Sequence, residues 1–324
     1  LGGISTTALE LLERYAATPA EHARSCNERA VVALHRGDLD RTESDALAGL
    51  AALGAADEPL LRAELRRNIA AVRLWRGDTQ GALAELRSVE HDIERLAPPP
   101  MKALFGQSLA IVLEHADQSE AGHAAAAQAT ARFLADGDVP SAVQTLLNDA
   151  LAYHDGGDLA QALATLERAR SLQDTLPERF HSYSSMELNF GFVLTGLGDY
   201  ARALHHLERA AESARAQTPG WMPLVAGHRA QLWLHLGQVA RARQELRAAE
   251  PDGATPPMAR NRWLLALAQI GAERVGEQPV GTALAELSAS VAPQGRRLSR
   301  WRAQVAQLLH MQPGAALSLA ESLW

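Results

Sequence analysis

The sequence predicts an all-α fold, an αα-superhelix in which about seven to eight antiparallel helix pairs stack along the chain. Three observations support this prediction. Apolar residues make up 47% of the 324 residues but aromatic residues only 5%, because the apolar share is mostly Ala and Leu. Both residues favour helices and allow close packing. A short turn recurs about every 40 residues, and prolines and small residues recur in the same register.

The recurring turn is a glycine followed by a polar residue, usually Asp. Glycine ends a helix because it takes the left-handed conformation without a Cβ clash, and Asp caps the helix that follows. The third copy has Ala116 in place of glycine. The copies are Arg36-Gly37-Asp38, Arg76-Gly77-Asp78, Ala116-Asp117, Gly157-Asp158, Gly198-Asp199 and Gly237-Gln238, which gives spacings of 40, 39, 41, 41 and 39 residues.

Prolines and small residues add two further registers. Prolines recur where the loop between one pair and the next should end, which suits a residue tolerated only in the first helical turn. They are Pro19, Pro59, Pro100, Pro140 and Pro177. A small residue precedes each turn by seven, and small or apolar residues follow it at 12, 16 and 19, so that paired helices can approach closely. The sets are Ala30/Thr42/Ala46/Gly49, Ala70/Ala82/Leu86/Val89, Ala150/Ala162/Leu166/Ala169, Gly191/Ala203/Leu207/Ala210 and Ala230/Ala242/Leu246/Ala249.

These registers predict one solenoid over residues 1–324, cut from a longer protein. A lone second helix is expected at Ser5 to Tyr15, and the apolar end at Leu317, Leu319, Leu323 and Trp324 lacks the polar cap that a solenoid needs. Such uncapped ends favour self-association into a homo-oligomer. The expected repeats span approximately 19–57, 58–97, 98–138, 139–176, 177–218, 219–255, 256–292 and 293–324.

The segment Gly191 to Ala210, GFVLTGLGDYARALHHLERA, resembles the tetratricopeptide repeat. The family repeat has 34 residues, whereas this one has about 40. Long repeats of this kind are similar to the helical sensor region of MalT-like bacterial regulators and to peptide-binding receptors of the Rap type. The resemblance implies a non-catalytic, cytoplasmic binding or sensing platform, the sensor arm of a bacterial signalling or transcriptional regulator. The alternative is a protein–protein interaction scaffold without a small ligand.

Several other functions are disfavoured by the sequence. The net charge of −7 is spread along the chain, so we expect no direct contact with nucleic acid, and we interpret Arg296, Arg297, Arg300 and Arg302 as a solvated helix face. Cys26 is the only cysteine, and no apolar run is long enough to span a bilayer. No metalloprotease, hydrolase or phosphate-loop motif is present. The adjacent His205 and His206 point about 100° apart on a helix, so they cannot chelate together. We expect no enzyme, cofactor or metal site.

The resemblance also indicates where a partner would bind. In this family the first helix of each pair lines a concave groove, and the residue two before the small packing position faces it. That position holds Glu28, Asn68, Asn148, Asn189 and His228, and its expected neighbours include Arg24, Arg67, Gln144, Phe192 and Gln231. An asparagine amide both donates and accepts, so it can bind a peptide backbone or a sugar hydroxyl. Alternatively, these asparagines bond to a neighbouring helix and stiffen the stack.

The partner expected in this groove is a protein or peptide, or a small-molecule inducer. A chaperone-type clamp for a terminal carboxylate is not expected, because Lys102 is the only lysine. The residues Trp75, Trp221, Trp233 and Trp263 fall in or just before first helices. We expect most of them in the core. For Trp75 core packing is favoured over exposure at the rim of the groove.

Overall fold

The computed structural model describes residues 16–176, 182–253, 255, 257–270, 274–275 and 278–279. The expected helix at Ser5 to Tyr15, the expected repeats beyond residue 270, the Arg296–Arg302 cluster and the apolar C-terminal residues lie outside this described part. The chain divides into two compact units at Asp138 and Val139. We call them the N-terminal unit and the C-terminal unit and describe each by itself.

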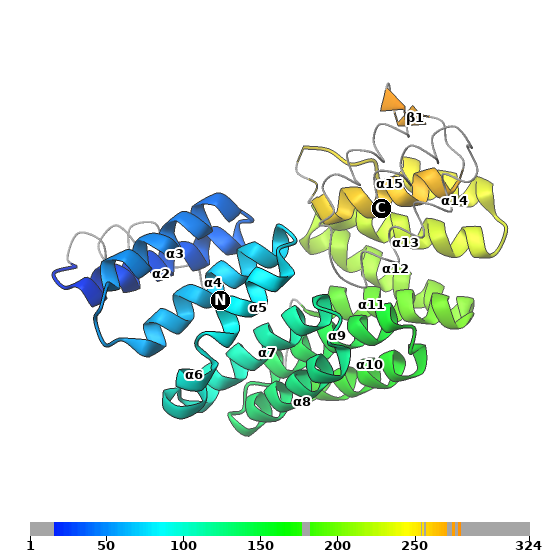
Figure 1. Ribbon diagram of the computed structural model, residues 1–324. Coiled ribbons are helices and arrows are strands. Elements are labelled where there is room, and N and C mark those ends of the chain that lie inside the picture. Colours follow the sequence, from blue (N-terminus) through cyan, green and yellow to red (C-terminus); the bar gives the residue numbers. More distant parts are fainter. Residues whose placement is uncertain are drawn as a thin grey trace. The chain divides into compact units, whose positions relative to one another are not determined.

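Both units are built of helices that pair in chain order (Figure 1). The N-terminal unit holds α2 (Pro19–His35), α3 (Leu39–Leu53), α4 (Pro59–Trp75), α5 (Thr79–Arg87), α6 (Glu90–Leu96), α7 (Pro99–His115) and α8 (Ser119–Ala135). The C-terminal unit holds α9 (Val139–Gly156), α10 (Leu159–Gln173), α11 (Ser182–Leu197), α12 (Tyr200–Gln217), a 3₁₀ turn (Pro219–Trp221), α13 (Met222–His235), α14 (Val239–Arg247) and α15 (Pro257–Gln269). A two-residue antiparallel hairpin, β1 (Arg274–Val275) with β2 (Gln278–Pro279), follows.

The predicted turns join the two helices of each pair. Five turn glycines, Gly37, Gly77, Gly157, Gly198 and Gly237, have φ between 70° and 89°, the left-handed region that glycine enters without strain. The third turn corrects the sequence prediction by one residue. There Asp117, not Ala116, takes the left-handed conformation, at φ 60°. Aspartate tolerates this region better than most residues, so the turn forms without glycine.

Aspartate caps the second helix of four pairs, as predicted. The carboxylates of Asp38, Asp78, Asp158 and Asp199 each accept a hydrogen bond from the backbone N–H three residues later. Gln118 and Gln238 occupy the same position before α8 and α14, and neither forms a side-chain cap. The helix starts therefore share one backbone shape but not one set of hydrogen bonds.

Small residues allow the paired helices to approach, as the packing register predicts. Ala30, Ala150 and Ala230 are fully buried, each seven residues before its turn glycine. A Cβ added at Gly191 would come within 2.5 Å of the Leu207 side chain, so α11 and α12 pack too closely for any larger residue. The resulting cores consist mostly of Ala and Leu side chains, in separate clusters in the N-terminal unit and in one large cluster that runs through the C-terminal unit.

The first helices of successive pairs also contact one another. In the N-terminal unit α4 contacts both α2 and α7, and in the C-terminal unit contacts run from α9 to α11, α13 and α15. We call the surface that these helices share in each unit its first-helix face. None of the helices in the described part of the chain is long and apolar enough to cross a membrane.

Trp75 departs from the expected core packing. Its side chain is 66% exposed, whereas Trp233 and Trp263 are buried as predicted. The physical reason is its place at the last residue of α4, directly before the turn, where the helix surface is no longer covered by its partner. Its neighbour Arg76 forms ion pairs with Asp40 and Glu43 of α3 at the same end.

Candidate functional site

In the N-terminal unit, Asn68 lies inside the stack of first helices. Its side chain is fully buried, and its amide nitrogen donates to Asn27 Oδ1 at 2.9 Å. Asn27 Nδ2 in turn donates to Glu64 Oε2 at 3.0 Å. We call Asn27, Glu64 and Asn68 the amide chain. It links α2 to α4, so Asn68 here bonds to the neighbouring helix, which was the alternative for the asparagine series.

Arg67 lies next to the amide chain and is partly buried. Burial lowers the pKa of Arg67, and the charge of Glu64 opposes that shift. The pKa of Glu64 is raised, because burial and the charge of Glu28 outweigh the attraction of Arg67 and Arg24. The two side chains therefore compensate each other across one turn of α4.

In the C-terminal unit, aromatic rings connect three first helices. The His154 ring lies 3.9 Å from the Phe192 ring, and Phe192 meets the His228 ring edge-on at 4.7 Å, measured between ring centroids. The positions shift along the helices. His154 stands three residues before its turn glycine, Phe192 six before Gly198 and His228 nine before Gly237. Three residues are nearly one helical turn, so the rings form a diagonal row across the first-helix face.

Arg262 of α15 extends this row. Its Nη2 lies 3.3 Å from His228 Nδ1, and its guanidinium carbon lies 5.2 Å from the centre of the Phe192 ring, within cation–π range. We call His154, Phe192, His228 and Arg262 the ring row. A Cβ at Gly227 would come within 3.0 Å of Arg262 Cγ, so the glycine makes room for the arginine stem between α13 and α15.

The electrostatics of the ring row follow from burial. Burial lowers the pKa of Arg262 to about 10, and the Asp155 carboxylate opposes that shift. The pKa of His228 is lowered well below 6.5 by burial first, then by the charges of Arg262 and His154. At neutral pH the arginine is therefore charged and His228 is neutral. Asp155 is adjacent in sequence to His154 and lies 3.3 Å from its Nδ1.

Two of the remaining predicted residues of this unit share faces with the ring row. Asn189 precedes Phe192 by three residues on α11, and Gln231 follows His228 by three on α13, spacings that place each pair on one helix face. Asn189 is 8% exposed, and no hydrogen bond joins its amide to another described residue. On α9, Gln144 Nε2 donates to the partly exposed Asn148 Oδ1 at 3.2 Å.

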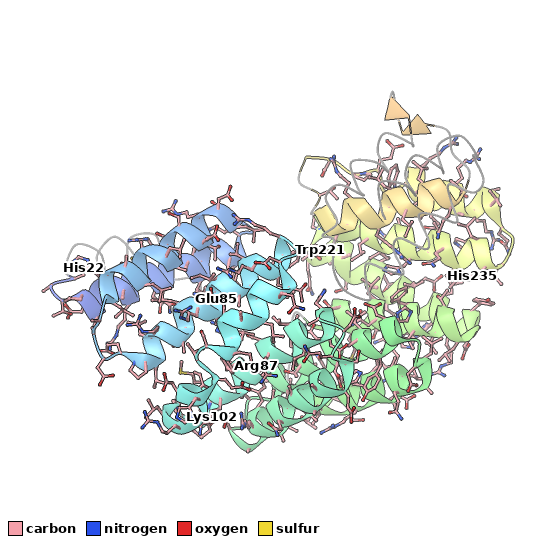
Figure 2. All side chains as sticks on the ribbon, viewed as in Figure 1. His22, Glu85, Arg87, Lys102, Trp221 and His235 are labelled. Carbon is pink, nitrogen blue, oxygen red and sulfur yellow. The ribbon has the colours of Figure 1, made fainter. Side chains whose placement is uncertain are left out.

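Buried and partly buried ion pairs hold the helices that carry these residues. Glu187 of α11 accepts from His206 Nδ1 at 2.7 Å and pairs with Arg209 at 3.2 Å, both on α12. Arg66 and Glu85 pair at 2.6 Å at the equivalent positions of the N-terminal unit, with the acid on the second helix instead (Figure 2, which labels Glu85). Arg229 and Glu245 pair at 2.9 Å between α13 and α14. These contacts fix the first helices against their partners.

Two members of the ring row were not among the predicted binding residues. They are His154 and Arg262. A signal for Arg262 does exist in the sequence, because it stands nine residues before Gly271, as His228 stands nine before Gly237. In the part of the chain that is described, no group of three or more His, Cys, Asp or Glu side chains could hold a metal ion.

Comparisons with known proteins support the fold. No protein-family model and no curated protein matches the sequence. Among solved structures, a Rap protein complexed with Competence and Sporulation Factor is similar at a TM-score of 0.68 and 16% identity, over 98% of this chain and 89% of that one. The Rap conjugation gene regulator of plasmid pLS20, in complex with the Phr* peptide, gives a TM-score of 0.58 and 14% identity, over 89% and 75%.

A tetratricopeptide repeat protein from Parabacteroides merdae is similar at a TM-score of 0.54 and 13% identity, over 83% of this chain and 93% of that one. At such low identity the likeness concerns the fold. The chain therefore has the fold of tetratricopeptide-like helical repeat proteins, as its turn and packing registers predict.

Proposed function

We propose that this chain is a non-catalytic platform that senses a peptide, and that the peptide binds on the first-helix face of the C-terminal unit. The role that fits is the sensor arm of a cytoplasmic bacterial signalling or transcriptional regulator. Two similar solved structures are Rap proteins, one with Competence and Sporulation Factor and one with the Phr* peptide. Those partners belong to the other proteins, so the proposal for this chain depends on its own residues.

The observation that carries the proposal is the amide of Asn189. The Asn189 side chain is 8% exposed, and no hydrogen bond joins its amide to another described residue. An amide without a protein partner is available to a ligand, and a hydrogen bond contributes about 0.5–1.5 kcal/mol when it forms. An extended peptide backbone presents both an N–H and a C=O. The oxygen of an asparagine amide can accept from that N–H while its nitrogen donates to that C=O. A bound peptide would therefore supply the hydrogen bonds that the protein does not.

The neighbours of Asn189 suit the same ligand. Phe192, one turn further along α11, offers an apolar surface, and Asn148 and Gln231 offer further amides from the adjacent first helices. Polar groups that converge beside an aromatic ring from several helices are typical of a recognition site. Since Asn148, Asn189 and His228 stand on successive first helices, a peptide lying across these helices would meet them in turn.

Binding to an array of short labelled peptides tests the proposal. The purified chain should bind a subset of the peptides, and Asn189→Ala should weaken that binding about tenfold, since it removes hydrogen bonds worth about 1–2 kcal/mol. Fluorescence anisotropy measures the affinity, and circular dichroism should show unchanged helicity.

Gln244→Ala is the matched control, because Gln244 is an exposed amide on the second helix α14. It should bind like the wild type. Failure of every peptide to bind would overturn the proposed function. Full affinity in Asn189→Ala would show instead that peptides bind elsewhere on the protein.

A further inference from the structure

Arg262 is a buried cation without a counter-ion at hydrogen-bonding distance. Its side chain is 8% exposed, and its Nε–H has no acceptor among the described residues. Among the described residues, no carboxylate forms an ion pair with it, and its nearest polar contact is the ring nitrogen of His228 at 3.3 Å. Other arginines of the unit differ, since Arg209 pairs with Glu187 at 3.2 Å and Arg229 with Glu245 at 2.9 Å.

This arrangement works against folding. Removing a cation from water is expensive unless a partner charge and hydrogen bonds replace the water. An apolar side chain of the same length would pack between α13 and α15 without that penalty, and such replacements are often neutral or stabilising. Residues that break a local rule without a compensating contact are concentrated at functional sites.

His228 adds a second donor. Because an arginine N–H can only donate, His228 Nδ1 must accept in the contact with Arg262, which places the ring proton on Nε2. No hydrogen bond joins Nε2 to another described residue, and the only polar contact of the ring there is the one to Arg262. The guanidinium and the imidazole N–H therefore stand together beside the Phe192 ring, both as donors and with one positive charge between them.

We propose that Arg262 and His228 form a subsite for a carboxylate group of the peptide bound on the first-helix face. This inference rests on the proposed function. A guanidinium forms strong, paired hydrogen bonds with a carboxylate. A single positive charge next to the Asp155 carboxylate matches a monoanion better than a phosphate dianion. The carboxylate would supply the counter-ion that Arg262 lacks, so binding would repay the desolvation of the guanidinium.

The test uses the tightest-binding peptides of the array, each in charged and neutral forms. One neutral form has a C-terminal amide in place of the carboxylate, and the other has Gln or Asn in place of each Glu or Asp. The wild type should bind the charged form about 10- to 100-fold more tightly than one of the neutral forms. The form that loses affinity shows whether the carboxylate is terminal or from a side chain.

Variants assign this preference to the subsite. Arg262→Met should lose the preference and bind charged and neutral forms alike, whereas Arg262→Lys should keep part of it because the charge remains. Arg243→Met changes an exposed arginine of α14 and should behave like the wild type. Thermal unfolding should show Arg262→Met to be as stable as the wild type or more so.

Different failures separate the two proposals. Peptides that bind equally in charged and neutral forms would overturn the carboxylate subsite and leave peptide sensing intact. The subsite is also overturned if Arg262→Met keeps the preference, or if it weakens all forms equally while lowering the unfolding temperature. Absence of any peptide binding to the wild type contradicts both proposals.

Discussion

Asn68 of the N-terminal unit and Asn189 of the C-terminal unit stand at the same repeat position, nine residues before Gly77 and Gly198. Asn68 is fully buried, and its amide nitrogen donates to Asn27 of the preceding first helix, although its Oδ1 has no partner among the described residues; no hydrogen bond joins the amide of Asn189 to another described residue. The difference lies in the neighbour, because α2 offers an amide oxygen at the facing position. One residue type at one repeat position can thus stiffen a stack or remain available to a ligand.

The same contrast holds for the charges nearby. Arg67 faces the compensating charge of Glu64, and the amide chain ends on that carboxylate. Arg262 contacts a neutral histidine and a phenylalanine ring, and the charge of Asp155 acts on it as the charge of Glu64 acts on Arg67. In the N-terminal unit the amide chain joins three side chains by hydrogen bonds, although Asn68 Oδ1 has no partner among the described residues. In the C-terminal unit the Nε–H of Arg262 is a buried donor without an acceptor there. This comparison leads us to place ligand binding in the C-terminal unit.

The largest predicted effect is that of replacing Asn68, and it tests whether Asn68 and Asn189 have different roles. Asn68→Ala should destabilise the N-terminal unit by about 1–3 kcal/mol, because it leaves Asn27 Oδ1 buried without its donor and opens a small cavity. Hydrogen exchange of the α2 and α4 amides measures this effect, with the α11 amides as an internal control. Peptide affinity should not change. A loss of affinity like that of Asn189→Ala would show that both asparagines contact the ligand.

A second effect concerns the pH dependence of the C-terminal unit. The pKa of His228 lies well below 6.5 in the folded protein, so below pH 6.5 the unfolded chain takes up a proton that the folded chain does not. The His228 contribution to the free energy of unfolding should be fully present above pH 6.5. As the pH falls below 6.5, the free energy of unfolding should decrease by up to about 1.4 kcal/mol per pH unit, until the pH reaches the lowered pKa of His228. Arg262 and Phe192 contact the His228 ring, the charge of His154 also acts on it, and Asp155 acts on Arg262 and lies beside His154.

Urea denaturation followed against pH tests this prediction. His228→Gln should remove the added loss of stability in acid. His22→Gln, at an exposed histidine of the N-terminal unit, should keep it (Figure 2 labels His22). Identical pH curves for the wild type and His228→Gln would contradict the prediction.

The smallest predicted effect comes from adding one helix cap to each unit, which compares the two units at equivalent positions. Gln118 and Gln238 have backbone angles close to those of the four capping aspartates, at φ −105°, ψ 53° and φ −92°, ψ 63°. Gln118→Asp and Gln238→Asp should therefore each add a cap and raise the free energy of unfolding by about 0.5–1 kcal/mol. Urea denaturation measures both. The two variants should gain the same free energy of unfolding, because a cap depends on the local backbone and not on the neighbouring repeat. Unequal gains would show that the stabilisation by these caps also depends on the neighbouring repeat.

The elements of the fold follow closely from the sequence. Gly37, Gly77 and their equivalents mark the turns, and the alanines seven residues before them are buried. The prediction slipped by one residue at Asp117, since a glycine signal cannot locate a turn that aspartate makes. It also placed Trp75 in the core, because apolar periodicity does not show where a helix surface stops being covered.

The sequence by itself determined the helix pairs and their registers, because turn, cap and close packing depend on residue types at short spacing. It also marked Asn68, Asn189 and His228 as one class of position. Only the tertiary structure decided which of these polar groups is paired. That outcome depends on what the next first helix presents: an amide oxygen to the Asn68 nitrogen, a guanidinium to His228, and no hydrogen-bond partner in the described part of the chain to Asn189.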